Sequence, residues 1–173
     1  MSELGGKTND SNSQSPSLKA RALRLLSLRE YSRKGLAAKL TESEARWAKL
    51  TELEQNPQAT ALNIEAVLDD FEARGWLSDE RFAEALVRRR SERYGSRKIQ
   101  EDLQRAGVDA KQSAKLLANL KETEFERAYH LWLKKFGQKA QDQKERARQY
   151  RFLASKGFSL DVVAKIIGGH TPD

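Results

Sequence analysis

Hydrophobic positions recur with helical spacing from residue 18 to the C-terminus. Ile64, Val67, Leu68 and Phe71 fall at i, i+3, i+4 and i+7, which places them on one apolar face of a helix. Alternating apolar and polar residues, the pattern of a half-buried strand, are missing from the sequence. The pattern therefore predicts an all-α protein.

A repeated frame of aromatic, aliphatic and glycine residues divides the chain into similar segments. In the first two segments, an aliphatic residue lies five positions after a tyrosine, and a second aliphatic residue lies four positions after the first. In the last two segments, a glycine lies four positions after a leucine. The matching positions are Tyr31, Leu36 and Leu40, then Tyr94, Ile99 and Leu103, with Leu103–Gly107 and Leu153–Gly157 as the glycine pairs. The frame predicts tandem three-helix repeats stacked on their neighbours.

The repeats have expected boundaries. We expect repeat units at residues 18–77, 78–120 and 121–170, preceded by a disordered polar tail at residues 1–17. Gly75 should end the last helix of the first unit. Ser78 should start the next helix, because its hydroxyl can accept an N-terminal backbone N–H and acidic residues follow it.

The first unit carries an additional segment of about 41–61 within its frame. Trp47 and Leu50 continue the apolar phase of Leu36 and Leu40, so the second helix should extend to about Glu54 and end before Pro57. We therefore interpret the segment as a helical insertion. In the third unit, the aromatic stripe that includes Tyr129 and Trp132 is interpreted as core.

Positive charge recurs at similar places in the units. The chain has 32 Lys and Arg against 25 Asp and Glu, a net charge of +7. Residues 18–40 carry seven cations and one acid, residues 86–98 six and one, and residues 142–158 five and two, whereas residues 41–78 are net acidic. Because the units stack, a recurring basic position should form a stripe that favours an anionic partner.

The arginine run of the second unit cannot face one ligand as a whole, because neighbouring helical residues diverge. Arg88 should point away, while Arg89 and Arg93 share a flank. Arg90 lies in the apolar stripe, so its stem should pack there while its head reaches solvent or an acid. Gly95 is expected to end this helix.

Two pairs of cations should lie in the first turns of the helices that follow the breaks. These pairs are Arg33 with Lys34 and Arg97 with Lys98. Cations oppose the dipole at a helix N-terminus, so their presence suggests an anionic target. A merely solvated charged face is the alternative.

Residues suited to catalysis or cofactor binding are sparse. Cysteine is absent, and His130 and His170 have neither a neighbouring nucleophile nor metal-ligand spacing. Asp69, Asp70 and Glu72 could hold a metal, but a simpler interpretation is that they form the solvent-exposed face of a helix. We therefore expect a protein that is not an enzyme and has no cofactor. The polar N-terminus and the lack of membrane-length apolar runs favour the cytoplasm.

Residues Leu68 to Val108 resemble the RecX family of regulators of the RecA recombinase. The motifs that carry the resemblance are GWLSDERFAEA at residues 75–85 and YGSRKIQEDLQRAGV at residues 94–108, supported by YSRKGLAAKL at 31–40 and FLASKGFSLDVVAKII at 152–167. The resemblance spans about residues 18–168. It implies a curved array of three units that lies in the groove of a RecA filament on single-stranded DNA.

The resemblance also implies an activity, namely inhibition of RecA ATPase and strand exchange by binding alone, in DNA repair and the SOS response. The expected partners are the RecA filament and single-stranded DNA, with double-stranded DNA as a further candidate, and the protein is expected to act as a monomer. The rival class is a sequence-specific helix-turn-helix DNA-binding regulator. The candidate contact residues are Arg33, Lys34, Arg89, Arg93, Arg97, Lys98, Arg148 and Arg151.

Overall fold

The computed structural model describes residues 16–173, which form nine helices and no strand. The prediction of an all-α protein is confirmed. Except for Pro16 and Ser17, the predicted polar tail lies outside the described residues. The helices are α1 (Leu18–Leu28), α2 (Arg33–Thr51), α3 (Pro57–Ala73), α4 (Asp79–Arg90), α5 (Ser96–Arg105), α6 (Ala110–Glu122), α7 (Glu124–Lys135), α8 (Gln143–Ser155) and α9 (Leu160–Ile167).

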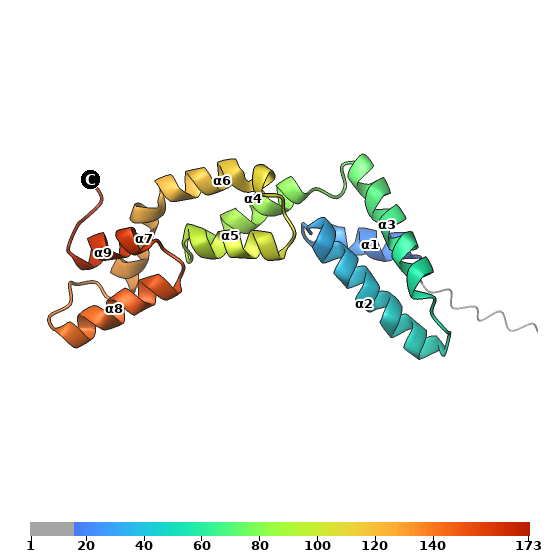
Figure 1. Cartoon of the computed structure of the whole chain (residues 1–173), viewed down its shortest axis with the longest axis horizontal. Coiled ribbons are helices and arrows are strands. Elements are labelled where there is room, and N and C mark those ends of the chain that lie inside the picture. Colours follow the sequence, from blue (N-terminus) through green and yellow to red (C-terminus); the bar gives the residue numbers. More distant parts are fainter. Residues whose placement is uncertain (1–15) are drawn as a thin grey trace, which may run out of the picture.

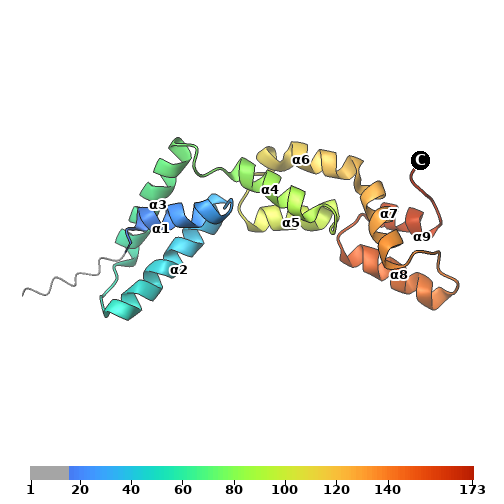
Figure 2. The same ribbon diagram turned by 180° about the vertical axis from the view of Figure 1, so that it is seen from behind.

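The helices form three consecutive groups of three along the long axis of the molecule (Figure 1). We call α1–α3 the first unit, α4–α6 the second and α7–α9 the third. Helices α2 and α8, in the two outer units, project to the same side beyond α5, which gives the array a curved outline (Figures 1 and 2). An elongated, curved array of three-helix repeats is therefore what this sequence forms.

Polar side chains at the helix starts explain where most helices begin. An Ncap side chain accepts a backbone N–H from the first turn and so satisfies a group that has no partner within the helix. Ser78 accepts from the N–H of Arg81, with Asp79 and Glu80 in the first turn, as predicted. The residues with this role are Ser17, Ser32, Asn56, Ser78, Asp109, Asp142 and Ser159.

Each unit has its own hydrophobic core. In the first unit, Leu36 and Leu40 of α2 pack with Ile64, Leu68 and Phe71 of α3. The apolar stripe predicted for α3 is therefore confirmed. The cores of the other two units form separate clusters, so the units meet through contacts of a different kind.

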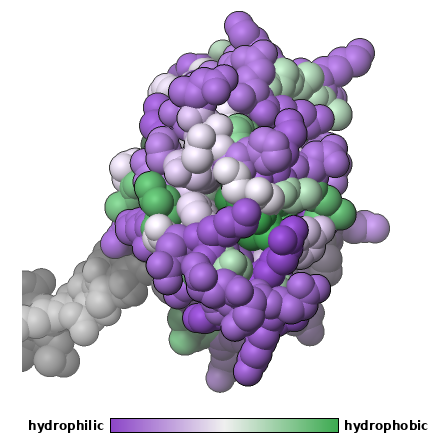
Figure 3. All heavy atoms as spheres, turned by 90° about the vertical axis from the view of Figure 1, so that its left-hand side faces the viewer, coloured by the Kyte–Doolittle hydropathy of each residue, from purple (hydrophilic) through white to green (hydrophobic). Residues whose placement is uncertain are grey.

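The aromatic residues of α7 belong to the core of the third unit, as predicted. Trp132 is buried and donates its indole N–H to Gln149 Oε1 at 2.8 Å, which satisfies both buried polar groups. Tyr129 packs beside it at the edge of the same cluster. The end of the array formed by this unit is largely hydrophilic, with smaller hydrophobic areas near its middle (Figure 3). A polar outer face is what a terminal repeat needs.

Two sequence predictions about the additional segment of the first unit are wrong. Helix α2 ends at Thr51 rather than near Glu54, because Glu52 takes a left-handed conformation with φ 54°. Leu50 is not part of the apolar face, since it is 69% exposed. The reason is the length of α1, which at 11 residues is too short to cover the last turns of the 19-residue α2.

The prediction that Gly95 ends a helix is also wrong. Helix α4 ends at Arg90, and Gly95, with φ −78°, is the N-cap of α5. Its small size is needed for a contact between units instead. A Cβ atom at this position would lie 2.2 Å from the carbonyl oxygen of Gly157, and the N–H of Gly95 donates to the carbonyl of Lys156 at 2.9 Å.

Candidate nucleic-acid interface

The two junctions between units share one hydrogen-bonding arrangement. The N–H of Arg33 at the start of α2 donates to Asp79 Oδ1 at 2.7 Å, and the N–H of Ser96 at the start of α5 donates to Glu124 Oε1 at 2.7 Å. Each acid is the first residue of the next unit. It satisfies a backbone group that has no partner inside its own helix. The cations flanking these helix starts therefore lie where two units meet.

Lys34 and Lys98 take matching places at the two junctions. Each lies against a glycine of the following unit: a Cβ atom on Gly107 would be 3.0 Å from Lys34 Cβ, and one on Gly157 would be 2.5 Å from Lys98 Cβ. Lys34 remains exposed and Lys98 is half-buried. Neither has an ion-pair partner within residues 16–173.

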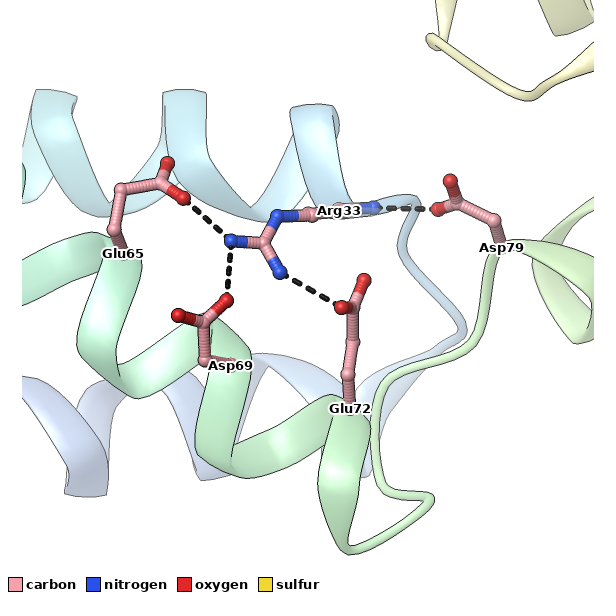
Figure 4. Close-up of polar contacts among 5 residues, drawn as sticks. All are labelled: Arg33, Glu65, Asp69, Glu72 and Asp79. Atoms are coloured by element: carbon pink, nitrogen blue, oxygen red, sulfur yellow. Dashed lines mark hydrogen bonds and ion pairs between the residues drawn. The ribbon is translucent and has the colours of Figure 1, made fainter.

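The guanidinium of Arg33 is held by three carboxylates of α3 (Figure 4). Nη1 donates to Glu72 at 2.7 Å, and Nη2 donates to Asp69 at 2.7 Å and also to Glu65. These hydrogen bonds, chiefly from Glu65 and Asp69, raise the pKa of Arg33 above its ordinary value. The charge of Arg33 is thus balanced within the chain, which leaves little of it for an external anion.

Arg90 turns inward from the arginine run. Its Nη1 lies 2.8 Å from Asp102 Oδ2, and its guanidinium carbon lies 4.4 Å from the centroid of the Tyr94 ring. Asp102 is buried. Of the two places predicted for the head of Arg90, solvent or an acid, the structure shows the acid, and Arg90 links α4 to α5.

The other arginines of the run differ in their surroundings. Arg88, Arg89 and Arg93 are exposed and make no ion pair with any described residue. Because α4 ends before Arg93, Arg89 and Arg93 do not share a helix flank. Arg97 is exposed and donates to the carbonyl of Ala154 at 3.1 Å, near the negative end of the α8 dipole. Arg97 therefore contributes to the junction as well as to the surface charge.

The candidate cations of the third unit lie on α8. Arg148 pairs with Glu145 at 3.3 Å. Arg151 is exposed and lines a groove of about 490 Å³ between α8 and α9, together with Arg146 and Tyr150. Of the two predicted residues, Arg151 keeps the more available charge.

A larger pocket, of about 610 Å³, lies between the turn after α4 and helices α7 and α8. Five cationic side chains and a histidine line it: Arg93, Arg127, His130, Lys134, Lys135 and Lys156. Glu92 is the single carboxylate among its lining residues, and Leu131 and Phe152 supply apolar surface. Sequence reasoning identified Arg93 alone from this set. The others come together only when α7 and α8 pack beside the α4–α5 turn.

Arg127 carries a partly desolvated charge in the wall of this pocket. Its guanidinium donates to the carbonyls of Ser91 at 2.6 Å, Tyr94 at 2.9 Å and Leu120 at 2.7 Å, all of them neutral acceptors. Burial lowers the pKa of Arg127 from its ordinary value. Arg127 thus joins the second and third units while it adds positive potential to the pocket.

Unbalanced positive charge is concentrated away from the first unit. Residues 18–77 contain ten Lys and Arg against nine Asp and Glu, whereas residues 121–170 contain eleven against six. Ion pairs neutralise most cations of the first unit, whereas in the described part of the third unit only Arg148 is paired. An anionic partner would therefore be attracted most strongly to the second and third units.

These features define a helical-repeat protein of three three-helix units with a basic surface over its second and third units. Residues 78–117 match a family model described as RecX, second three-helix domain, and residues 122–167 match the RecX third three-helix domain. The chain is 44% identical over 158 residues to Regulatory protein RecX of Leptothrix cholodnii, covering 91% of both chains. It is 40% identical to Regulatory protein RecX of Ralstonia pickettii, covering 88% of this chain and 87% of that one. The chain belongs to the RecX family.

Solved structures support the fold. A crystal structure of RecX from Lactobacillus salivarius aligns with a TM-score of 0.63 at 20% identity and covers 87% of this chain and 92% of that one. A second crystal structure of regulatory protein RecX aligns with a TM-score of 0.67 at 22% identity and covers 88% and 72%. Among the helices of residues 16–173, none has the length and apolar character needed to cross a membrane.

Proposed function

We propose that this protein regulates the RecA recombinase by binding the filament that RecA forms on single-stranded DNA. In this proposal it lowers RecA ATPase activity, strand exchange and filament growth during DNA repair and the SOS response, and it catalyses no reaction itself. Membership of the RecX family supports RecA as the partner. The observation on this chain that carries the proposal is the excess of unpaired cations along a curved array.

The distribution of these cations favours an extended polyanionic partner. Lys34 lies at the first junction, Arg93 and Lys98 lie near the second, and Arg151 lies on the third unit. A partner that contacts all of them must follow the array over its whole length, as a filament does. A helix-turn-helix reader instead concentrates its base contacts on one recognition helix. We further propose that the protein acts as a cytoplasmic monomer.

Co-sedimentation with RecA filaments tests the proposal. RecA assembled on single-stranded DNA with ATP should carry the protein into the pellet, and substoichiometric protein should lower DNA-dependent ATP hydrolysis, because one bound regulator blocks filament growth beyond it. If excess protein with native helicity neither sediments with the filament nor changes the ATPase rate, the proposed function is wrong.

Two variants, one of unpaired and one of paired cations, locate the contact. Replacing Lys34, Arg89 and Arg151 with Ala removes three unpaired charges and should weaken filament binding. Replacing Lys39 and Arg46 with Ala removes cations already paired with Glu42 and should leave binding near the wild-type level. Equal loss in both variants would show that the unpaired cations have no special part in the contact.

A further inference from the structure

We propose that the pocket between the second and third units binds a nucleotide, with its cations holding a phosphate and its apolar surface holding the base. The ligand chemistry has two sources, a nucleotide of a single DNA strand or a free nucleoside triphosphate. The strand source rests on the proposed function, whereas the free nucleotide does not.

The charge of the pocket selects a phosphate. Arg93, Lys134 and Lys135 are exposed at its rim, and none makes an ion pair with another residue of the described chain. Arg33, by contrast, is balanced by three carboxylates of α3. Arg127 adds a charge whose hydrogen bonds go to neutral carbonyls and a hydroxyl, while Glu124 lies near enough to attract it. Glu92 is the only acidic residue among the lining residues. The electrostatic potential in the pocket is therefore positive and attracts an anion.

The apolar part of the pocket suits a planar base. Leu131 and Phe152 lie in the wall, and Lys156 is 5.5 Å from the centroid of the Phe152 ring. Bases stack on aromatic side chains without sequence preference, and cations beside the ring contribute to such sites. A volume of about 610 Å³ lies within the range of small-molecule sites.

The pocket is formed before any ligand binds. Its two sides belong to different units, and these are joined by the hydrogen bonds of Arg127 to the turn after α4 and by the contact between Gly95 and Lys156. A preorganised site avoids the cost of ordering its groups on binding. The shape of the pocket is therefore a property of the folded chain.

The test uses the full chain without RecA. Fluorescence anisotropy would compare a labelled thymidine oligonucleotide, an abasic oligonucleotide of equal length and charge, and a labelled nucleoside triphosphate. The wild type should bind the thymidine strand about tenfold more tightly than the abasic strand, because only the former has bases to place in the pocket.

The pocket variant is Lys134→Ala with Lys135→Ala. It should lose most of the base-dependent difference and lower the slope of log affinity against log salt by about 1.4 units on the DNA strand, about 0.7 for each lysine. The control, Lys111→Ala with Lys115→Ala, removes two exposed and unpaired lysines outside the pocket and should keep the base-dependent difference. If the pocket variant loses nucleoside triphosphate binding and the control variant keeps it, the pocket also binds free nucleotides.

The proposal is overturned if the pocket variant and the control bind every probe alike. It is also overturned if the pocket variant binds every nucleotide probe like the wild type but no longer sediments with RecA filaments, since the pocket would then be a protein contact. If wild-type protein fails to sediment with RecA filaments and still binds the thymidine strand more tightly than the abasic strand, that result would contradict the proposed function and support the nucleotide pocket.

Discussion

Replacing Gly157 with alanine tests how closely the second and third units approach each other. Gly157 follows α8 with φ +86°, a conformation that costs an L residue roughly 1–2 kcal/mol. Its new Cβ atom would also lie 2.5 Å from Lys98 Cβ and 2.8 Å from the Lys98 backbone nitrogen. Overpacking of this kind costs about 1–3 kcal/mol. We expect Gly157→Ala to lower the free energy of unfolding by about 2–5 kcal/mol in total.

Substitutions at two other glycines separate the cost of the positive φ from the cost of the steric overlap. Gly75 has φ +72° and no atom within 4 Å of an added Cβ, so Gly75→Ala should lose only the backbone part, about 1–2 kcal/mol. Gly95 has an ordinary φ of −78°, but its added Cβ would lie 2.2 Å from the Gly157 carbonyl oxygen. Gly95→Ala should therefore lose only the contact part.

Urea unfolding followed by far-ultraviolet circular dichroism measures these differences, with thermal midpoints expected to fall by about 2–4 °C per kcal/mol. The reasoning fails if Gly157→Ala is no less stable than Gly75→Ala and Gly95→Ala is as stable as the wild type. That result would mean that the two units do not meet at this backbone contact in solution.

Three further changes test charges inside the array. Arg33→Ala should lower the free energy of unfolding by about 1–2 kcal/mol, because three carboxylates of α3 lose their counter-charge, and an unchanged urea midpoint would contradict this. The pKa of Asp70 is lowered by Lys19 and then by Arg74. Its stabilising contribution is therefore complete above the ordinary aspartate pKa and is lost as pH falls through the lowered value, so Asp70→Asn should flatten the acid side of a stability-against-pH curve. Glu124→Leu should cost about 1–3 kcal/mol because two buried donors at the start of α5 lose their acceptor, whereas Glu124→Gln should cost less, which melting curves can compare.

Local signals in the sequence were sufficient to predict much of the fold. The apolar stripe of Ile64, Leu68 and Phe71 has helical spacing, and the same residues are buried against α2. Ser78 marks a helix start because capping depends on neighbours within a few residues. The position of Arg90 within its own apolar stripe was enough to predict that its head reaches either solvent or an acid. The choice of the acid, which is Asp102, depends on how α5 packs against α4.

Contacts between distant segments could not be predicted in the same way. Arg33 looks like an exposed cation at a helix start, but its carboxylate partners begin 32 residues later, at Glu65. The pocket cations Lys134 and Lys135 look like ordinary last-turn residues of a helix, which favour the C-terminal end of its dipole. Lys134 and Lys135 line one pocket with Arg93 only because of the angle at which the third unit docks on the second, and periodicity and spacing do not predict that angle.

The two junctions differ in the strength of their contacts, and this difference bears on binding. Side chains at the first junction include Arg81 and Glu30, which pair at 3.0 Å but are 43% and 34% exposed, so salt screens their attraction. The second junction contains the buried carboxylate of Glu124 and the backbone contact of Gly95 with Gly157. Buried contacts are screened far less. We therefore expect added salt to weaken the first junction, where the Arg33 N–H bond to Asp79 remains, more than the second. In the proposed function, a firmly joined second junction would preserve the basic pocket, and a looser first junction would let the array follow the curvature of a filament.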